Sequence, residues 1–194
     1  MQSATLRTFF ACQISPENLA QIEQLLAELE SPSSNAVKWV NPKNLHLTLK
    51  FIGDFKQADI DRIKPVLAEA LSAFESFPIN IHTLSAFPSL DRPQVVWLGL
   101  TADPALFQLV KTVEKQCEHL NYPAEKRPFA AHITIGRLRS SATPAEKNLI
   151  SKVIRARQSI DIGKQRIDAL HFYKSELTPA GPIYQILFTL PFTS

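Results

Sequence analysis

The chain has 194 residues, 45 % of them hydrophobic and 20 % charged, and a formal net charge of +3 at pH 7. This composition is typical of a folded globular protein and excludes an intrinsically disordered chain. Residues 1–100 carry 8 basic and 10 acidic side chains, and residues 101–194 carry 13 and 8. The mild basic excess of the second half permits binding of a small anionic ligand or an RNA end. The sequence does not have the dense stripe of Lys and Arg that is typical of proteins that bind a long duplex.

Strand and helix patterns alternate along the first half of the chain. Strands are expected at residues 8–14, 37–40, 45–52 and 79–87. One helix is expected from Pro16 to about residue 30, with Ser15 as its N-cap. A second is expected over 59–77, where Pro65 marks either a kink or the start of the main part.

The second half repeats this order. A strand at residues 95–100 precedes a helix over 104–119 and a strand over 131–138. Thr143 begins the next helix with a capping-box pattern, since Pro144 and Glu146 follow it. One long strand or two are expected within 160–176, and a last strand at 183–190.

Each half therefore contains a strand, a helix, a strand that begins with a His-x-Thr motif, a helix and a strand. We expect a single bilobal domain over residues 1–194, with duplicated units at approximately 5–90 and 93–192. The predicted fold class is α+β: two pseudo-twofold-related halves, each with a mainly antiparallel sheet and helices on its outer face, and an active-site cleft between the lobes. A doubly wound dinucleotide fold is excluded, because the five glycines are too far apart for GxGxxG or a P-loop.

The two cysteines, Cys12 and Cys117, are not part of a CxxC pair. We expect free core thiols in a reducing compartment. No apolar run approaches the roughly 18 residues of a membrane span, so we expect a cytoplasmic protein that does not associate with membranes. A monomer is the default expectation.

The two His-x-Thr motifs are the main candidates for chemistry. Residues i and i+2 of a strand share a face, so His46 lies beside Thr48 and His132 beside Thr134. Two imidazoles across a cleft can take a proton from a nucleophile and give one to a leaving oxygen, which displacement at phosphorus requires. The threonine hydroxyls can donate to phosphate oxygens as charge develops there.

A metal site is the alternative explanation for histidines. The other three, His82, His119 and His171, form no HExxH pattern and have no CxxC companion. We therefore expect no metal and no cofactor.

Several segments together resemble the two-histidine (2H) phosphoesterase superfamily, and within it the bacterial and archaeal RNA 2′,3′-cyclic phosphodiesterases, also called 2′-5′ RNA ligases. These segments are Arg7–Ala11, His46–Asp54, Val95–Gly99, Arg127–Phe129, His132–Arg137, Tyr173–Leu177 and Gly181–Tyr184. Two positions depart from the family pattern: Ala131 replaces the usual proline before the second histidine, and Gln94 replaces an arginine.

The resemblance implies metal-free opening of a 2′,3′-cyclic phosphate at an RNA end to leave a 2′-phosphate. The expected partners are RNA ends or small cyclic nucleotides, and the sequence does not choose between them. It implies that His46 donates a proton to the leaving 3′ oxygen and that His132 accepts one from the attacking water. It also implies that Thr48, Thr134 and Arg137 bind the phosphate.

Strand alternation alone does not decide which of the cationic side chains near the two motifs reach the cleft. It turns Arg137 away from His132 unless the strand ends or bulges near Gly136. It places Lys50 on the face of His46. Arg127 and Arg139 are candidate charges at the cleft rim for RNA phosphates.

Two alternative functions remain open from the sequence. The same histidines would catalyse the reverse reaction, in which a 2′,3′-cyclic end joins a 5′-hydroxyl through a 2′-5′ bond. A non-catalytic module that binds a nucleotide or an RNA end is the other alternative.

Overall fold

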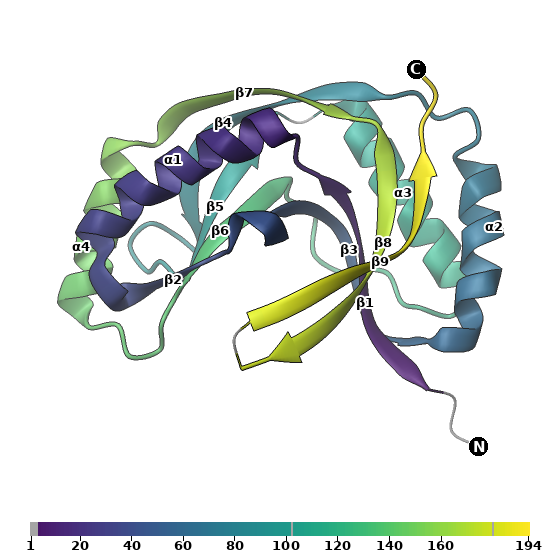
Figure 1. Cartoon of the computed structure of the whole chain (residues 1–194), viewed down its shortest axis with the longest axis horizontal. Coiled ribbons are helices and arrows are strands. Elements are labelled where there is room, and N and C mark those ends of the chain that lie inside the picture. The colour runs from purple at the N-terminus through teal and green to yellow at the C-terminus, as the bar shows by residue number, and fades with distance from the viewer. Residues whose placement is uncertain (1–3, 102, 180) are drawn as a thin grey trace.

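The structure, a computed structural model that describes residues 4–101, 103–179 and 181–194, contains two antiparallel sheets (Figure 1). The first sheet has the order β3-β1-β8-β9, made of His46–Lys56, Thr5–Gln13, Ala169–Thr178 and Gly181–Pro191. The second has the order β2-β6-β5-β4-β7, made of Val37–Trp39, His132–Leu138, Val95–Leu100, Phe77–Phe87 and Ser159–Ile167. The predicted α+β class with antiparallel sheets is confirmed.

Two helices pack with each sheet. α1 (Pro16–Ser33) and α4 (Pro144–Ala156) contact each other and the strands β7 and β4 of the second sheet. α2 (Ile60–Ala70) and α3 (Pro104–His119) contact each other, and α3 contacts β3 of the first sheet. The predicted caps are present: Ser15 Oγ accepts from the backbone N–H of Asn18, and Thr143 and Glu146 form a capping box. Asp103 caps α3 by accepting from the backbone N–H of Ala105.

The helix expected over 59–77 is too long, because α2 ends at Ala70. Residues beyond it pair with the C-terminal segment instead. The N–H of Thr193 donates to the carbonyl of Phe74, and the N–H of Ser76 donates to that of Thr193. Backbone pairing with a distant strand end therefore overrides a helical pattern, while Pro65 is accommodated inside the helix.

Each sheet contains strands from both halves of the sequence. β4 comes from the first half but joins β5 in the second sheet, and β8 comes from the second half but joins β1 in the first sheet. The helices cross in the same way, since α1 packs with the second sheet and α3 with the first. The order β3-β1-β8-β9 thus corresponds to β6-β5-β4-β7 with the motif strands in equivalent places.

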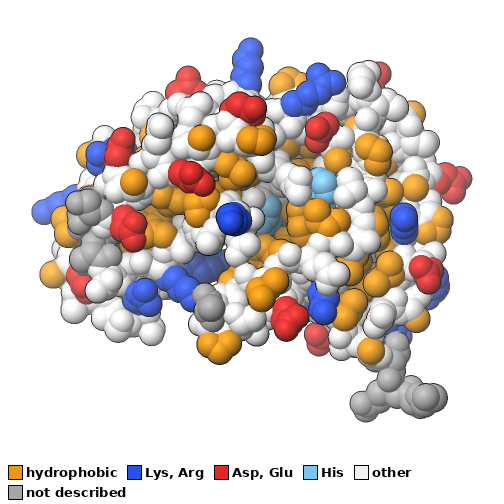
Figure 2. Space-filling model, in the orientation of Figure 1, with side chains coloured by type: hydrophobic (Ala, Val, Ile, Leu, Met, Phe, Trp, Pro, Cys, Tyr) orange, Lys and Arg blue, Asp and Glu red, His pale blue; other side chains and the backbone are white. Residues whose placement is uncertain are grey.

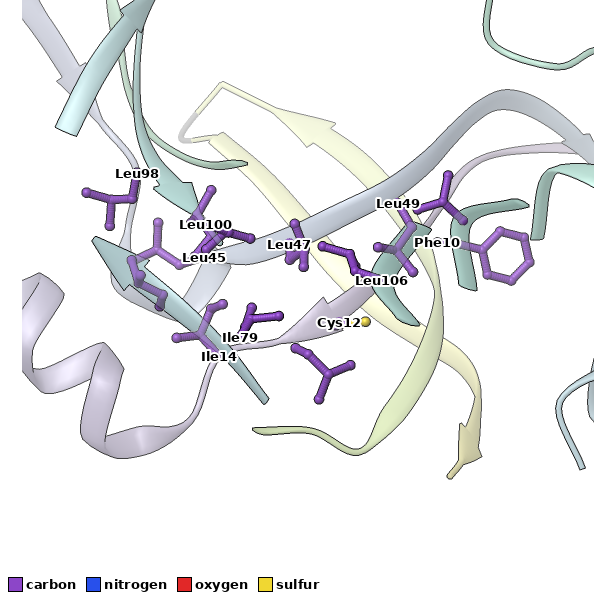
Figure 3. Close-up of a cluster of buried hydrophobic side chains, with 14 of the residues drawn as sticks. Phe10, Cys12, Ile14, Leu45, Leu47, Leu49, Ile79, Leu98, Leu100 and Leu106 are labelled. Carbon is purple, nitrogen blue, oxygen red and sulfur yellow. The ribbon is translucent and has the colours of Figure 1, made fainter. Parts of the chain in front are cut away.

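Most buried apolar residues form one cluster that continues from one sheet to the other (Figure 3), and Phe9, Ala11 and Tyr173 form a second, smaller one. Phe10 and Leu47 of the first sheet belong to the larger cluster, as do Leu98 and Leu100 of the second. Cys12 and Cys117 lie in the same cluster and are unpaired, as expected. Within the described residues, no helix combines the length and the apolar character that crossing a membrane requires.

Candidate active site

Each histidine of the two motifs is the first residue of a strand. β3 begins at His46 and β6 at His132, and these strands contact each other although they belong to different sheets. Nδ1 of His46 lies 2.7 Å from the carbonyl oxygen of Asn44, and Nδ1 of His132 lies 2.7 Å from that of Ala130. Because a carbonyl oxygen only accepts, Nδ1 carries the hydrogen in both rings. Nε2 is therefore the nitrogen that each histidine can offer to a substrate.

A pocket of about 830 Å³ lies between the two sheets' motif strands and the β8–β9 hairpin. Its lining includes four of the predicted site residues, His46, Thr48, Thr134 and Arg137. The fifth, His132, is not among the lining residues; its ring packs edge-on against Phe87 at 5.0 Å. The pocket thus draws side chains from both motifs, although the two histidines differ in their exposure to it.

A β-bulge in β6 decides where Arg137 points. Thr134 pairs with Trp97 and Gly136 with Val96, so Ile135 is an extra residue with no partner in the ladder. The alternation of buried and exposed residues breaks there, since Ile135 and Gly136 are both buried and Arg137 is exposed. Arg137 therefore returns to the side of Thr134 and lines the pocket.

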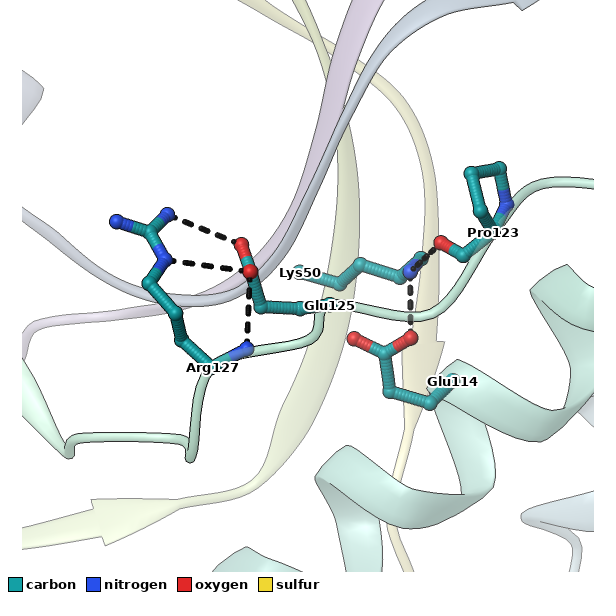
Figure 4. Close-up of polar contacts among 5 residues, drawn as sticks. All are labelled: Lys50, Glu114, Pro123, Glu125 and Arg127. Carbon is teal, nitrogen blue, oxygen red and sulfur yellow. Dashed lines mark hydrogen bonds and ion pairs between the residues drawn. The ribbon is translucent and has the colours of Figure 1, made fainter.

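The equivalent bulge in β3 has the opposite effect on Lys50. Thr48 pairs with Ala11 and Lys50 with Phe10, which leaves Leu49 as the extra residue. Lys50 is turned away from the pocket and is 4 % exposed. Its Nζ donates to Glu114 at 2.5 Å and to the carbonyl of Pro123 at 2.8 Å (Figure 4). The expectation that Lys50 shares the face of His46 is wrong, because the bulge inverts the alternation.

Phe51 occupies, in the first motif strand, the position that Arg137 occupies in the second. Each lies five residues after its histidine, and each lines the pocket. The guanidinium of Arg7 lies over the Phe51 ring, 4.6 Å from its centroid. β3 has Phe51 where β6 has Arg137, and Arg7 of the neighbouring strand β1 supplies the positive charge at that position.

His46 lies in an aromatic environment on the first sheet. Its ring stacks on Phe9 with 4.8 Å between centroids and meets the edge of Tyr184 at 5.3 Å. Burial lowers the pKa of His46, and the hydrogen bond to the Asn44 carbonyl opposes that shift. Burial raises the pKa of Tyr184, and the guanidinium groups of Arg137 and Arg7 oppose that rise. In the free protein, the surroundings of His46 thus favour the neutral imidazole.

The remaining predicted cations lie outside the pocket lining. Arg127 is exposed and pairs with Glu125 at 3.1 Å (Figure 4), and Arg139 is also exposed. Several lining residues were not predicted as site residues. Lys38, Trp39 and Asn41 lie outside the segments that carry the family resemblance. Ser175, Leu177, Pro182 and Ile183 lie within such segments, but no site role was predicted for them. Among the described residues, no group of three or more His, Cys, Asp or Glu is placed to hold a metal ion.

Comparison with known proteins places this chain in a family. The model of the LigT-like phosphoesterase family matches residues 13–97 and again residues 98–184. The RNA 2′,3′-cyclic phosphodiesterase of Methanothermobacter thermautotrophicus is 31 % identical over 179 residues, which are 92 % of this chain and 95 % of that protein. The enzyme of the same name from Archaeoglobus fulgidus is 31 % identical over 94 % of this chain and 98 % of its own length.

Solved structures agree on the fold. A Thermus thermophilus protein superposes with a TM-score of 0.81 at 22 % identity, over 96 % of this chain and 98 % of its own. E. coli LigT in complex with 3′-AMP superposes with a TM-score of 0.78 at 22 % identity, over 98 % of this chain and all of its own. The resemblance seen in the motifs is confirmed, and the chain belongs to the LigT-like phosphoesterase family.

Proposed function

We propose that this protein hydrolyses 2′,3′-cyclic phosphates at RNA ends to 2′-phosphomonoesters, without a metal ion. The observation that carries the proposal is the pair of histidines at the starts of two contacting strands. Each has Nδ1 bound to a backbone carbonyl, so that Nε2 is available for proton transfer. The names of the archaeal relatives supply the substrate class.

In the proposed reaction, Nε2 of His132 takes a proton from water as the water oxygen attacks phosphorus. The bond between phosphorus and the 3′ oxygen breaks, and His46 gives its proton to that oxygen. The products are a 2′-phosphate and a 3′-hydroxyl, and proton exchange with solvent restores both imidazoles. Thr48, Thr134 and Arg137 donate to the non-bridging oxygens, where negative charge increases in the transition state.

His46 must be protonated to act as the donor, yet its burial favours the neutral form. The negative charge of the cyclic phosphate, once bound beside His46 and Thr48, favours the imidazolium. Substrate binding therefore converts His46 to the protonated form that acts as the proton donor. This coupling makes the acid step depend on an anion in the pocket.

We further propose that the protein acts as a monomer in the cytoplasm and that its two halves arose by duplication. The buried, unpaired cysteines fit a reducing compartment. Two matches of one family model to one chain, and the parallel order of strands in the two sheets, support the duplication.

The test is incubation of the purified protein, in EDTA, with an RNA that ends in a 2′,3′-cyclic phosphate. We expect only the 2′-phosphate, and we expect His46→Ala and His132→Ala each to abolish turnover. His82→Ala is the matched control, since His82 is exposed and lies outside the pocket lining. A 3′-phosphate product would refute the assigned roles of the histidines, and unchanged activity in both variants would refute the mechanism.

A further inference from the structure

Two positive charges lie opposite each other at the edge of the second sheet. Lys38 in β2 is the cross-strand partner of Arg137 in β6, and both line the pocket. Like charges that face each other across a ladder destabilise the sheet. None of the ion pairs found among the described residues gives either side chain an acidic partner. A bound anion at this edge would relieve the repulsion.

The strand order sets the direction in which this cationic edge extends from the catalytic motif. Thr134 and Arg137 lie on β6, and β2 is the outer neighbour of β6 in the sheet. A ligand that reaches from Thr134 to Lys38 therefore extends outward from the histidines. The pocket volume of about 830 Å³ is high in the roughly 300–1,000 Å³ range of ligand sites, so there is room beyond one cyclic phosphate.

The β8–β9 hairpin contributes exposed apolar side chains to the pocket, beside the hydroxyl groups of Ser175 and Thr178. Leu177 and Ile183 line the pocket, although they are 67 % and 59 % exposed. Figure 2 shows Lys and Arg side chains on the second-sheet side of the hollow and hydrophobic side chains toward the hairpin. Cationic side chains opposite exposed apolar side chains match a nucleotide, which has a phosphate on one side and a base with apolar faces on the other.

We infer that the pocket holds two nucleotides of an RNA end. The terminal cyclic phosphate lies at the histidines, the phosphodiester on its 5′ side binds Lys38, and the penultimate base packs on Leu177 and Ile183. This inference rests on the proposed function and names its preferred substrate: an oligonucleotide end and not a free cyclic mononucleotide.

The test compares kcat/KM for adenosine 2′,3′-cyclic phosphate with kcat/KM for the dinucleotide ApA that carries the same cyclic end. We expect the wild-type protein to prefer the dinucleotide, and we expect Lys38→Gln to reduce that preference about tenfold, mainly through KM. Lys38→Arg keeps the charge and should retain the preference. Added salt should also reduce it, because the contact is electrostatic.

Matched controls separate the subsite from general effects. Lys152→Gln removes an exposed charge on α4 outside the pocket lining and should leave the preference unchanged. Replacing both Leu177 and Ile183 by Ser should reduce the preference, whereas Leu149→Ser, at an exposed leucine on α4, should not.

Three results would count against the inference in distinguishable ways. No preference for the dinucleotide in the wild-type protein would overturn the subsite and leave the proposed hydrolysis intact. An equal loss on both substrates in Lys38→Gln would overturn the subsite as well. Absence of turnover on both substrates would overturn the proposed function, and the subsite with it.

Discussion

Gly136 lies directly against the indole of Trp39: a Cβ atom at Gly136 would be 2.6 Å from Cε3 of Trp39 and 2.8 Å from Cγ1 of Val37. Trp39 lines the pocket, and Gly136 directly follows the bulged Ile135 that redirects Arg137. The absence of a side chain at Gly136 therefore allows the side chains of Trp39 and Val37, on the edge strand β2, to pack against the backbone of β6.

Gly136→Ala should destabilise the protein by about 1–3 kcal/mol, because the methyl group must displace Trp39 or Val37. Urea denaturation measures the loss in the free energy of unfolding. The same variant should raise KM, since Trp39 moves in the pocket wall. A shorter side chain in the double variant Gly136→Ala with Trp39→Leu should recover part of the stability. Wild-type stability in Gly136→Ala alone would contradict the close approach.

The pH dependence follows from the burial of His46. Burial lowers the pKa of His46, and the proposed donor must be protonated. The value of kcat/KM reports the free protein, so it should fall as pH rises through a pKa below the ordinary ~6.5 of histidine. The corresponding limb of kcat should lie at higher pH, because the bound phosphate favours the imidazolium.

The variant Phe9→Leu tests the cause of this pKa shift. Removing the stacked ring exposes His46 to water, which should move its pKa, and with it the kcat/KM limb, toward the ordinary value. Titration of the His46 ring by NMR in wild type and Phe9→Leu gives the same quantity directly. A His46 pKa above 6.5 in the free wild-type protein would contradict the effect of burial.

The two threonines should contribute comparably to transition-state stabilisation. Thr48→Val and Thr134→Val remove one hydroxyl donor each at nearly constant shape, and each should reduce kcat about 10²-fold. Thr112→Val, at a half-buried position on α3 outside the pocket lining, is the matched control and should leave kcat unchanged. Effects confined to KM would mean that the hydroxyls bind the ground state and the transition state equally.

The two ion pairs of Figure 4 should differ sharply in their contribution to stability. Lys50→Met leaves Glu114, whose side chain is 18 % exposed, without its partner and removes a donor from the Pro123 carbonyl. The expected loss is about 3–5 kcal/mol, and Lys50→Met with Glu114→Leu should recover most of it. Arg127→Gln breaks an exposed pair and should cause no measurable change. Equal effects at the two sites would contradict this reading.

Hydrophobic periodicity predicted most of the elements because strands and helices in this chain have one clearly buried side. The pattern within 160–176 allowed one strand or two, and the structure resolves it as β7 and β8, which meet near Asp168. The end of α2 was not predictable from periodicity, because it depends on pairing with Thr193, more than a hundred residues away. Local sequence carries no information about such a partner.

The motif histidines and threonines were predictable from the sequence because each motif is local and occurs twice. The directions of Lys50 and Arg137 were not, because one extra residue in each motif strand, Leu49 or Ile135, inverts the alternation. The hydrogen bonds that orient the two imidazoles were not predictable either, because their acceptors are the backbone carbonyls of Asn44 and Ala130 and any residue type provides such a carbonyl. Lys38 and the β8–β9 hairpin reach the pocket only through long-range pairing.

The exchange of strands and helices between the two halves has a mechanical consequence. Within the described residues, several chain connections join the two lobes, since β4 and β8 each cross from one sequence half to the other lobe. The apolar core also continues through both sheets. Hinge bending would expose the apolar core that both sheets share, so we expect the lobes to move as one rigid body. We therefore expect the two imidazoles, at the starts of β3 and β6, to keep a constant separation, which would restrict the size of the group that can bind between them.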